Sequence, residues 1–385
     1  MVSRAGSSRP ILATRVAFFI AGALIATWAP MVPFVKHQAL LSDGTLGVLL
    51  LTLGLGAMLA MPLSGSAAAR FGCRAVIVAS STSAALLLPS LVFLPTPAWL
   101  FVGLPLLGFA VGMLDVTMNI QAVMVQRRSI RPMMSGFHAF FSIGGFAGAG
   151  GASFLLQAGL SHATATLTAA GLLLLLLVTT ARHMLAEGGE GDSQGFALPR
   201  GPVLLIGIAC LIVFLTEGAM LDWGALFLNL VHSAAPASTG FGYAAFASAM
   251  TLGRLLGDRI VRILGARVII LAGGICAALG VTLAMLPLPW PLPLAGFLLI
   301  GLGCANIVPV LFTAAGNQSV MPANQALAAV TTVGYAGVLV GPAVIGFIAQ
   351  ASSLRTAFAC IALALIMVAF IGPVVGAKEQ SRKPA

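Results

Sequence analysis

Charged side chains are scarce in this sequence. Asp, Glu, Lys and Arg make up only 7% of its 385 residues, whereas 59% are hydrophobic. A soluble domain carries about 25% charged and about 45–50% apolar residues, so this composition cannot supply a surface that faces water. The main solvent of the chain must be lipid, and the composition predicts an all-α integral membrane protein.

The patterns that mark metal, redox and nucleotide sites are also missing. The five cysteines are scattered, and none has the spacing of a metal ligand or a redox pair. No Gly-x-x-x-x-Gly-Lys-Ser/Thr string occurs, which argues against an ATP-driven pump. We therefore expect no cofactor, no metal site and no disulfide framework.

What the chain has instead is a series of long apolar runs. Each is long enough to cross a bilayer as a helix, which takes roughly 17–25 residues. We place twelve transmembrane helices at about 14–36, 45–69, 75–94, 98–125, 132–158, 162–183, 202–230, 237–257, 267–286, 293–317, 323–350 and 355–376.

The net charge of +10 comes from basic residues at the joints between these runs. Nucleic acid is therefore not an expected partner, because its binding sites gather basic residues on one face. With the N-terminus inside, seventeen of the nineteen Lys and Arg residues fall on the cytoplasmic side, and Lys36 and Arg355 fall outside. This positive-inside bias predicts two cytoplasmic termini in a bacterial inner membrane.

The only long polar joint falls at the middle of the chain. It predicts a six-helix bundle at 1–183, a cytoplasmic linker at 184–200 and a second six-helix bundle at 201–385. Short patterns recur across the linker at offsets of 191–196 residues; for example, Gly112-x-x-Asp115 returns as Gly303-x-x-Asn306. A parallel repeat of this kind predicts two bundles related by an axis along the membrane normal, with the substrate site between them at mid-depth.

Two loop patterns identify a family. Gly65-x-x-x-x-Arg70-x-Gly72-x-Arg74 follows the second run, and GRLLGDR (253–259) with Gly265-x-Arg267 follows the eighth. Both resemble the loop signature of the major facilitator superfamily, with Ala69 in place of the usual acid in the first copy and Asp258 in the second. The stretches at 115–123, 134–145, 216–223 and 306–316 are similar to the fucose-permease-like branch, especially to bacterial rhizopine-type carriers.

This resemblance implies a monomeric secondary transporter that works by alternating access. It also implies a cytoplasmic gate, in which an ion pair between Asp258 and an arginine holds one face shut. The gate residues are Arg70, Gly72, Arg74, Arg254, Asp258, Arg259 and Arg267. The fifth run has Gly144-x-x-x-Gly148-Ala149 without the proline of drug antiporters, which weakens a drug-efflux reading.

Three acids lie inside apolar runs, with no expected lysine or arginine at the same depth. They are Asp115, Glu217 and Asp222. A charge at the centre of a membrane helix costs about 2.5–3.5 kcal/mol on insertion scales, and binding a proton relieves that cost. We expect proton coupling through Glu217, Asp115, Asp222 and His138. The alternatives are interhelical hydrogen bonds that fix packing, a gate contact for Asp222 and a structural role for His138.

Polar and aromatic residues on the same runs are candidates for binding the solute. The set is Trp28, Asp115, Asn119, Glu217, Trp223 and Asn306, and ordinary helix packing is the alternative for the tryptophans. We expect proton-coupled transport of a sugar, polyol or related polar solute, and no enzymatic activity. The alternative is a proton antiporter that exports amphipathic compounds, and a nontransporting sensor ranks below both. Without a deep basic residue, strongly anionic substrates are disfavoured.

Overall fold

The computed structural model describes residues 8–41, 43–129, 131–188, 198–234, 240–289 and 291–376, so residues 189–197 of the expected linker lie outside it. Every regular element in these ranges is helical. The elements are α1 (Ser8–Trp28), η1 (Ala29–Met31), α2 (Val32–Gln38), α3 (Asp43–Phe71), α4 (Cys73–Phe93), α5 (Pro97–Arg127), α6 (Met134–Gln157), α7 (His162–Ala181), α8 (Pro202–Asp222), α9 (Gly224–His232), α10 (Gly240–Met285), α11 (Pro293–Cys304), α12 (Ile307–Asn317), α13 (Ala323–Ala351) and α14 (Leu354–Gly376).

Helices form here because a backbone in lipid must satisfy its own hydrogen bonds. Proline marks several helix starts, where its missing N–H costs nothing; α5, α8 and α11 each carry one in the first turn. The side chains of Thr96 and Ser161 cap α5 and α7 by accepting hydrogen bonds from the backbone N–H groups of Trp99 and Thr164.

Among the described residues, eleven helical segments are long and apolar enough to cross a membrane. The all-helical membrane architecture expected from the sequence is thereby confirmed. One segment, Phe241–Met285, is 45 residues long and contains Gly265 in a non-helical conformation, with φ 77° and ψ 160°. The joint that we expected between 257 and 267 is helical up to this glycine, so Asp258 lies in a helix and not in a loop.

Three of the expected spans are interrupted, although the sequence predicted continuous helices. The first breaks after Trp28, the seventh at Trp223 and the tenth at Ala305 and Asn306. Pro309 explains the last break, because it has no N–H to donate to the carbonyl of Ala305 four residues earlier.

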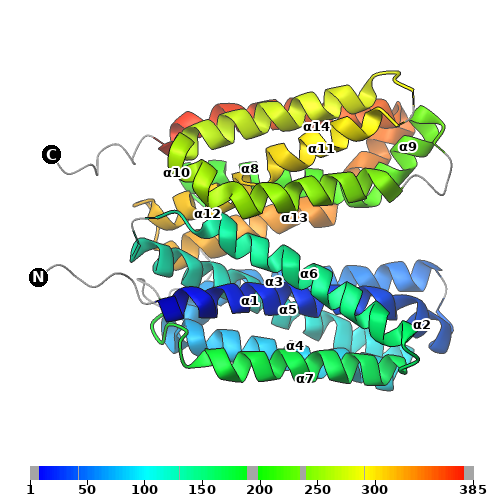
Figure 1. Cartoon of the computed structure of the whole chain (residues 1–385), viewed down its shortest axis with the longest axis vertical. Helices are drawn as coiled ribbons and strands as arrows, with labels where there is room; N and C mark the ends of the chain where they lie inside the picture. The colour runs from blue at the N-terminus through cyan, green and yellow to red at the C-terminus, as the bar shows by residue number, and fades with distance from the viewer. Residues whose placement is uncertain are drawn as a thin grey trace, which may run out of the picture. The chain divides into compact units, whose positions relative to one another are not determined.

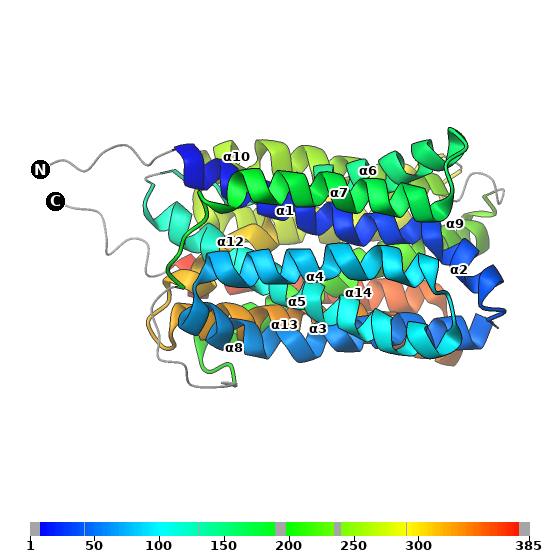
Figure 2. The same ribbon diagram turned by 90° about the horizontal axis from the view of Figure 1, so that it is seen from below.

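The chain folds into two compact units. Unit 1 is Met1–Ile130, Phe137–Leu198 and Pro322–Ala329; unit 2 is Arg131–Gly136, Pro199–Met321 and Val330–Ala385. Within unit 1, α4 packs against α5 and α7, and α1 packs against α5 and α7 (Figures 1 and 2). Within unit 2, α10 packs against α11 and α14 (Figure 1).

Matching glycines show that the two units pack their helices alike. A Cβ at Gly108 would overlap the carbonyl oxygen of Leu53, and a Cβ at Gly301 would overlap that of Phe246. Gly72 and Gly265, with φ of 83° and 77°, are separated by the same offset of 193 residues. The structural repeat therefore falls within the offsets expected from the sequence. In this register Asp258 matches Gly65, and Asn306 matches Met113 instead of Asp115.

A strap of residues 182–188 crosses the end of unit 1 where α3 stops and α4 starts. The backbone N–H groups of Cys73 and Arg74 donate to the carbonyls of Glu187 (3.2 Å) and Leu185 (2.8 Å). The N–H of Leu185 donates to Oε1 of the buried Gln121 on α5 (3.1 Å). These bonds fix residues 184–188, which we expected to begin the linker, onto unit 1.

Replacing the two matching glycines tests this arrangement. An alanine at either position adopts a backbone region that is essentially restricted to glycine, which costs about 1–3 kcal/mol. In Gly72→Ala the new Cβ also overlaps the carbonyl of Ala186 in the strap, whereas nothing lies within 4 Å of the Cβ in Gly265→Ala. Thermal unfolding in detergent should show the larger loss of Tm for Gly72→Ala, and an equal or smaller loss would contradict the strap contact.

Candidate functional site

The strongest candidate site lies in unit 2 and contains a pair of opposite charges. Glu217 on α8 and Arg254 on α10 form an ion pair, with 3.3 Å between Oε1 and Nη2. The Arg254 side chain is 9% exposed and that of Glu217 is 23% exposed. The pair is therefore largely withdrawn from water, where each charge depends strongly on the other.

The tenth span, which is broken at Ala305 and Asn306, contacts the arginine of this pair. Because Pro309 leaves the carbonyl of Ala305 without its helical donor, Nε of Arg254 can donate to that oxygen (3.3 Å). Nδ2 of Asn306 donates to the carbonyl of Gly253 (2.9 Å), and its Oδ1 lies where a Cβ on Gly257 would be. The site thus brings together one acid and one amide predicted from the sequence, Glu217 and Asn306, around one arginine.

The position of Arg254 corrects two expectations. We expected no basic side chain near the intramembrane acids, and this is wrong, because Arg254 is 7% exposed and bonded to Glu217. We also placed Arg254 in the cytoplasmic gate, because the motif at 253–259 resembles the loop signature of the superfamily. Its depth was visible in the sequence, since it stands inside the apolar run 237–257, about 21 Å from the start of α10 at 1.5 Å per residue.

Asp258 lies one helical turn after Arg254. Its Oδ2 accepts a hydrogen bond from the backbone N–H of Gly136 in the first turn of α6 (2.9 Å), a segment that belongs to unit 2. The first turn of a helix has free N–H groups and a positive dipole, which favour a carboxylate. Asp258 therefore contacts the N-terminus of α6, and its expected ion pair with an arginine stays a prediction.

Two further predicted residues lie at the break of the seventh span. Asp222 ends α8 and is exposed, on a different face from Glu217. Trp223 separates α8 from α9, and Gly346 lets α13 approach its ring. The indole Nε1 of Trp223 is buried and has no hydrogen-bond partner among the described residues.

In unit 1, the predicted stripe on the fourth span is buried. Gly108 and Gly112 bring α5 against the backbone of α3, as their spacing predicted. Asp115 is 9% exposed, and Asn119 is fully buried. Nδ2 of Asn119 donates to the carbonyl of Asp115 (2.8 Å), while its Oδ1 has no partner in the described part of the chain.

Trp28 and His138 occupy α1 and α6 of the same unit. Trp28 is 6% exposed, and its Nε1 has no acceptor among the residues that the structure describes. The ring of His138 packs edge-on against Phe18, with 5.2 Å between the ring centroids.

The remaining gate residues divide into two groups. Arg70, Arg259 and Arg267 are exposed. Arg74 instead donates from Nη2 to the carbonyl of Met184 (2.7 Å) and holds the strap together with Gly72. The buried Gln121, which also bonds to the strap, was not among our predicted residues, because a glutamine in an apolar run does not reveal its partner.

Known proteins match this chain along most of its length. The model of the Major Facilitator Superfamily matches residues 15–323. An uncharacterised MFS-type transporter of Yersinia pestis is 52% identical over 93% of this chain and 94% of its own length. The membrane protein MosC of Rhizobium meliloti is 34% identical over 94% of this chain and 89% of its own. The crystal structure of the E. coli fucose:proton symporter FucP has a TM-score of 0.76 at 13% identity, covering 95% and 98% of the two chains.

The chain belongs to the major facilitator superfamily. It is a multi-pass membrane transporter and not an enzyme. The resemblance found in the loop motifs and in the fucose-permease-like stretches is therefore confirmed.

A double-mutant cycle tests the Glu217–Arg254 pair. Glu217→Gln leaves a buried guanidinium without its counter-charge, which should lower the free energy of unfolding by about 1–3 kcal/mol, less than for a fully buried pair because Glu217 is partly exposed. Arg254→Gln should cost a similar amount, and the double variant should cost less than the sum of the two. Asp222→Asn is the matched control and should change stability by no more than about 0.5 kcal/mol. Additive losses would show that the two side chains are not coupled.

Proposed function

We propose that the chain crosses a bacterial inner membrane twelve times, with both termini in the cytoplasm. The 45-residue segment counts as two spans, because the break at Gly265 divides it into two helices of about 20 residues or more, each long enough to cross. The match of Gly265 with Gly72, which separates α3 from α4, supports the same division. Moving Arg254 into a span leaves sixteen basic residues inside against two outside, so the positive-inside bias remains.

We infer that this monomeric transporter couples the movement of a small solute to that of a proton by alternating access. The ion pair of Glu217 with Arg254 carries the proposal. A carboxylate held by one arginine in a poorly hydrated site has two states: ionised and paired, or protonated with the arginine released. One charge moving across 100 mV is worth about 2.3 kcal/mol, enough for roughly fifty-fold accumulation of a solute.

Each unit contains buried hydrogen-bonding groups without partners among the described residues, and groups of this kind favour a polar, uncharged solute. Two indole N–H donors, on Trp28 and Trp223, and two amide oxygens, on Asn119 and Asn306, are buried without partners in the described parts of the chain. Buried polar groups cost free energy unless something bonds to them. Such a mixture of donors and acceptors suits the hydroxyl groups of a sugar or polyol. FucP of E. coli is a fucose:proton symporter, and its activity is of the same kind.

Asp115, Asp222 and His138 remain second candidates for the proton path, and Asp258 is proposed for the gate. The hydrogen bond from Gly136 to Asp258 ties the start of the fifth span to the eighth, and we propose that it breaks when the cavity opens to the cytoplasm. The proposed gate also includes five residues at the cytoplasmic ends of helices: Arg70, Gly72, Arg74, Arg259 and Arg267.

Transport in liposomes tests the coupling. Sugars, polyols and amphipathic compounds are added to vesicles that contain a pH-sensitive dye, and solute-driven proton movement is recorded. For a sugar or polyol symporter, proton entry should follow solute addition. Glu217→Gln should abolish this proton entry but retain exchange of labelled solute. Proton exit with an amphipathic compound would replace symport with efflux. If Glu217→Gln leaves proton movement intact, Glu217 is not the carrier.

Cysteine accessibility tests the gate. In Asp258→Asn the neutral amide loses the charge that interacts with the N-terminus of α6, a loss worth about 0.3–1 kcal/mol, or up to roughly fivefold in a conformational equilibrium. A single cysteine near residue 136 should then be labelled faster from the cytoplasmic side than in the same cysteine variant with Asp258 intact. Equal labelling rates would remove Asp258 from the gate.

A further inference from the structure

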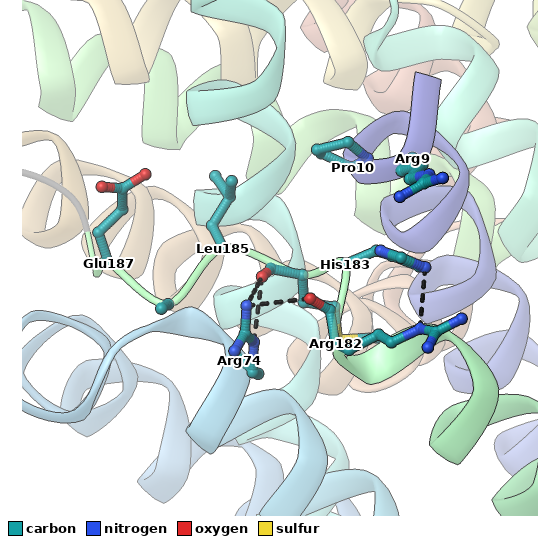
Figure 3. A pocket seen from close by; sticks show the side chains of 9 residues that line it. Arg9, Pro10, Arg74, Arg182, His183, Leu185 and Glu187 are labelled. Carbon is teal, nitrogen blue, oxygen red and sulfur yellow. Dashed lines mark hydrogen bonds between the residues drawn. The ribbon is translucent and has the colours of Figure 1, made fainter. Parts of the chain in front are cut away.

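Unit 1 contains a basic pocket that the transport mechanism does not use. It is a cavity of about 320 Å³ at the end of the unit where α1 begins and α7 ends. Its lining consists of Arg9, Pro10, Arg74, Arg182, His183, Met184, Leu185, Ala186 and Glu187. Figure 3 shows the Arg9 and His183 side chains on one side of this pocket and Glu187 on the other.

The charges in the pocket do not cancel. Glu187 is the only acid of the lining, and its carboxylate is already paired with Arg128 outside the pocket. The guanidinium of Arg74 donates hydrogen bonds to the carbonyls of Arg182 (3.1 Å) and Met184 (2.7 Å) (Figure 3). Two arginines, Arg9 and Arg182, therefore remain as the cations that can meet a ligand.

These two cations come with further donors. Nε of Arg182 donates to Nε2 of His183 (3.2 Å), so the neutral histidine carries its proton on Nδ1. Arg9 has no hydrogen-bond partner among the described residues, and it lies in the first turn of α1, whose backbone N–H groups add a positive dipole. Guanidinium groups match the oxygens of a phosphate in number and geometry.

Apolar side chains continue from the two arginines along their helices. Leu12 follows Arg9 by three residues on α1 and is 55% exposed; Val178 precedes Arg182 by four on α7 and is 72% exposed. Residues at these spacings share a helix face. A ligand with a phosphate and an attached hydrocarbon chain would contact both parts.

We propose that this pocket binds a phosphate group, held by Arg9 and Arg182, and that its source is an anionic phospholipid of the surrounding bilayer. Basic pockets at the ends of membrane helices are suited to such headgroups. The proposal needs α1 and α7 to be membrane helices but does not depend on proton coupling or on the identity of the solute.

Lipid binding to the purified full-length protein tests the proposal, with phosphatidylglycerol as the probe and native mass spectrometry as the measurement. Each arginine near a membrane surface contributes about fivefold in affinity, so the double variant R9Q/R182Q should bind about 25-fold more weakly. The matched control R200Q/R262Q removes two exposed arginines elsewhere and should bind as the unsubstituted protein. Inorganic phosphate distinguishes the sources: if it binds with the same dependence on Arg9 and Arg182 while phosphatidylglycerol does not, the site takes soluble phosphate. Equal binding of both probes by R9Q/R182Q and by its control overturns the site.

A second measurement uses the unsubstituted protein and so does not depend on how the variants fold. The pKa of His183 lies below its ordinary value, first because the ring has lost part of its water and then because it faces positive charges. Those charges are on Arg182, Arg9 and Arg74, and the nearest acid of the lining is Glu187. A bound phosphate favours the protonated ring, so phosphatidylglycerol should raise the pKa of His183 in an NMR titration. A pKa that does not change at saturating lipid would place the phosphate elsewhere and overturn the proposal.

Discussion

Hydrocarbon offers the peptide backbone no hydrogen-bond partner, and this constraint governs the molecule. It makes every described element a helix, and it favours a substitute partner where a helix is interrupted. Pro309 removes the donor for Ala305, and Arg254 supplies another. Gly72 ends α3, and the strap bonds to the freed backbone of Cys73 and Arg74. Polar contacts therefore gather at these two breaks.

The two units use one packing scheme for different purposes. Glycines 193 residues apart allow the same close contacts, between α3 and α5 in unit 1 and between α10 and α11 in unit 2. The polar residues do not follow this repeat. At the same offset Glu217 and Arg254 correspond to Leu24 and Met61, so the ion pair exists in one unit only. A shared scaffold with an unshared charge pair suits a transporter in which one unit holds the proton site, as we propose.

The basic residues likewise divide by environment. Arg254 is buried and needs Glu217, because an unpaired charge in a poorly hydrated site costs several kcal/mol. Arg9 and Arg182 lie where α1 begins and α7 ends, where water reduces that cost, and so they can remain open to a ligand. Arg74 is intermediate in exposure, and its guanidinium donates hydrogen bonds to backbone carbonyls. The same residue type therefore serves as a counter-ion, as a ligand group and as a structural brace.

Composition and local sequence patterns were enough to predict the membrane class, the approximate spans, the repeat and the superfamily. They also singled out Asp115, Asn119, Glu217 and Asn306, because polar residues are conspicuous in apolar runs. The contacts between distant residues came from the folded structure: Arg254 pairs with Glu217, Asp258 contacts the start of α6, Arg74 holds the strap, and Arg9 shares a pocket with Arg182. Each of these contacts joins residues 37 to 173 positions apart. Such contacts depend on how helices are rotated and stacked, and helical periodicity in a nearly uniform apolar sequence does not fix that rotation.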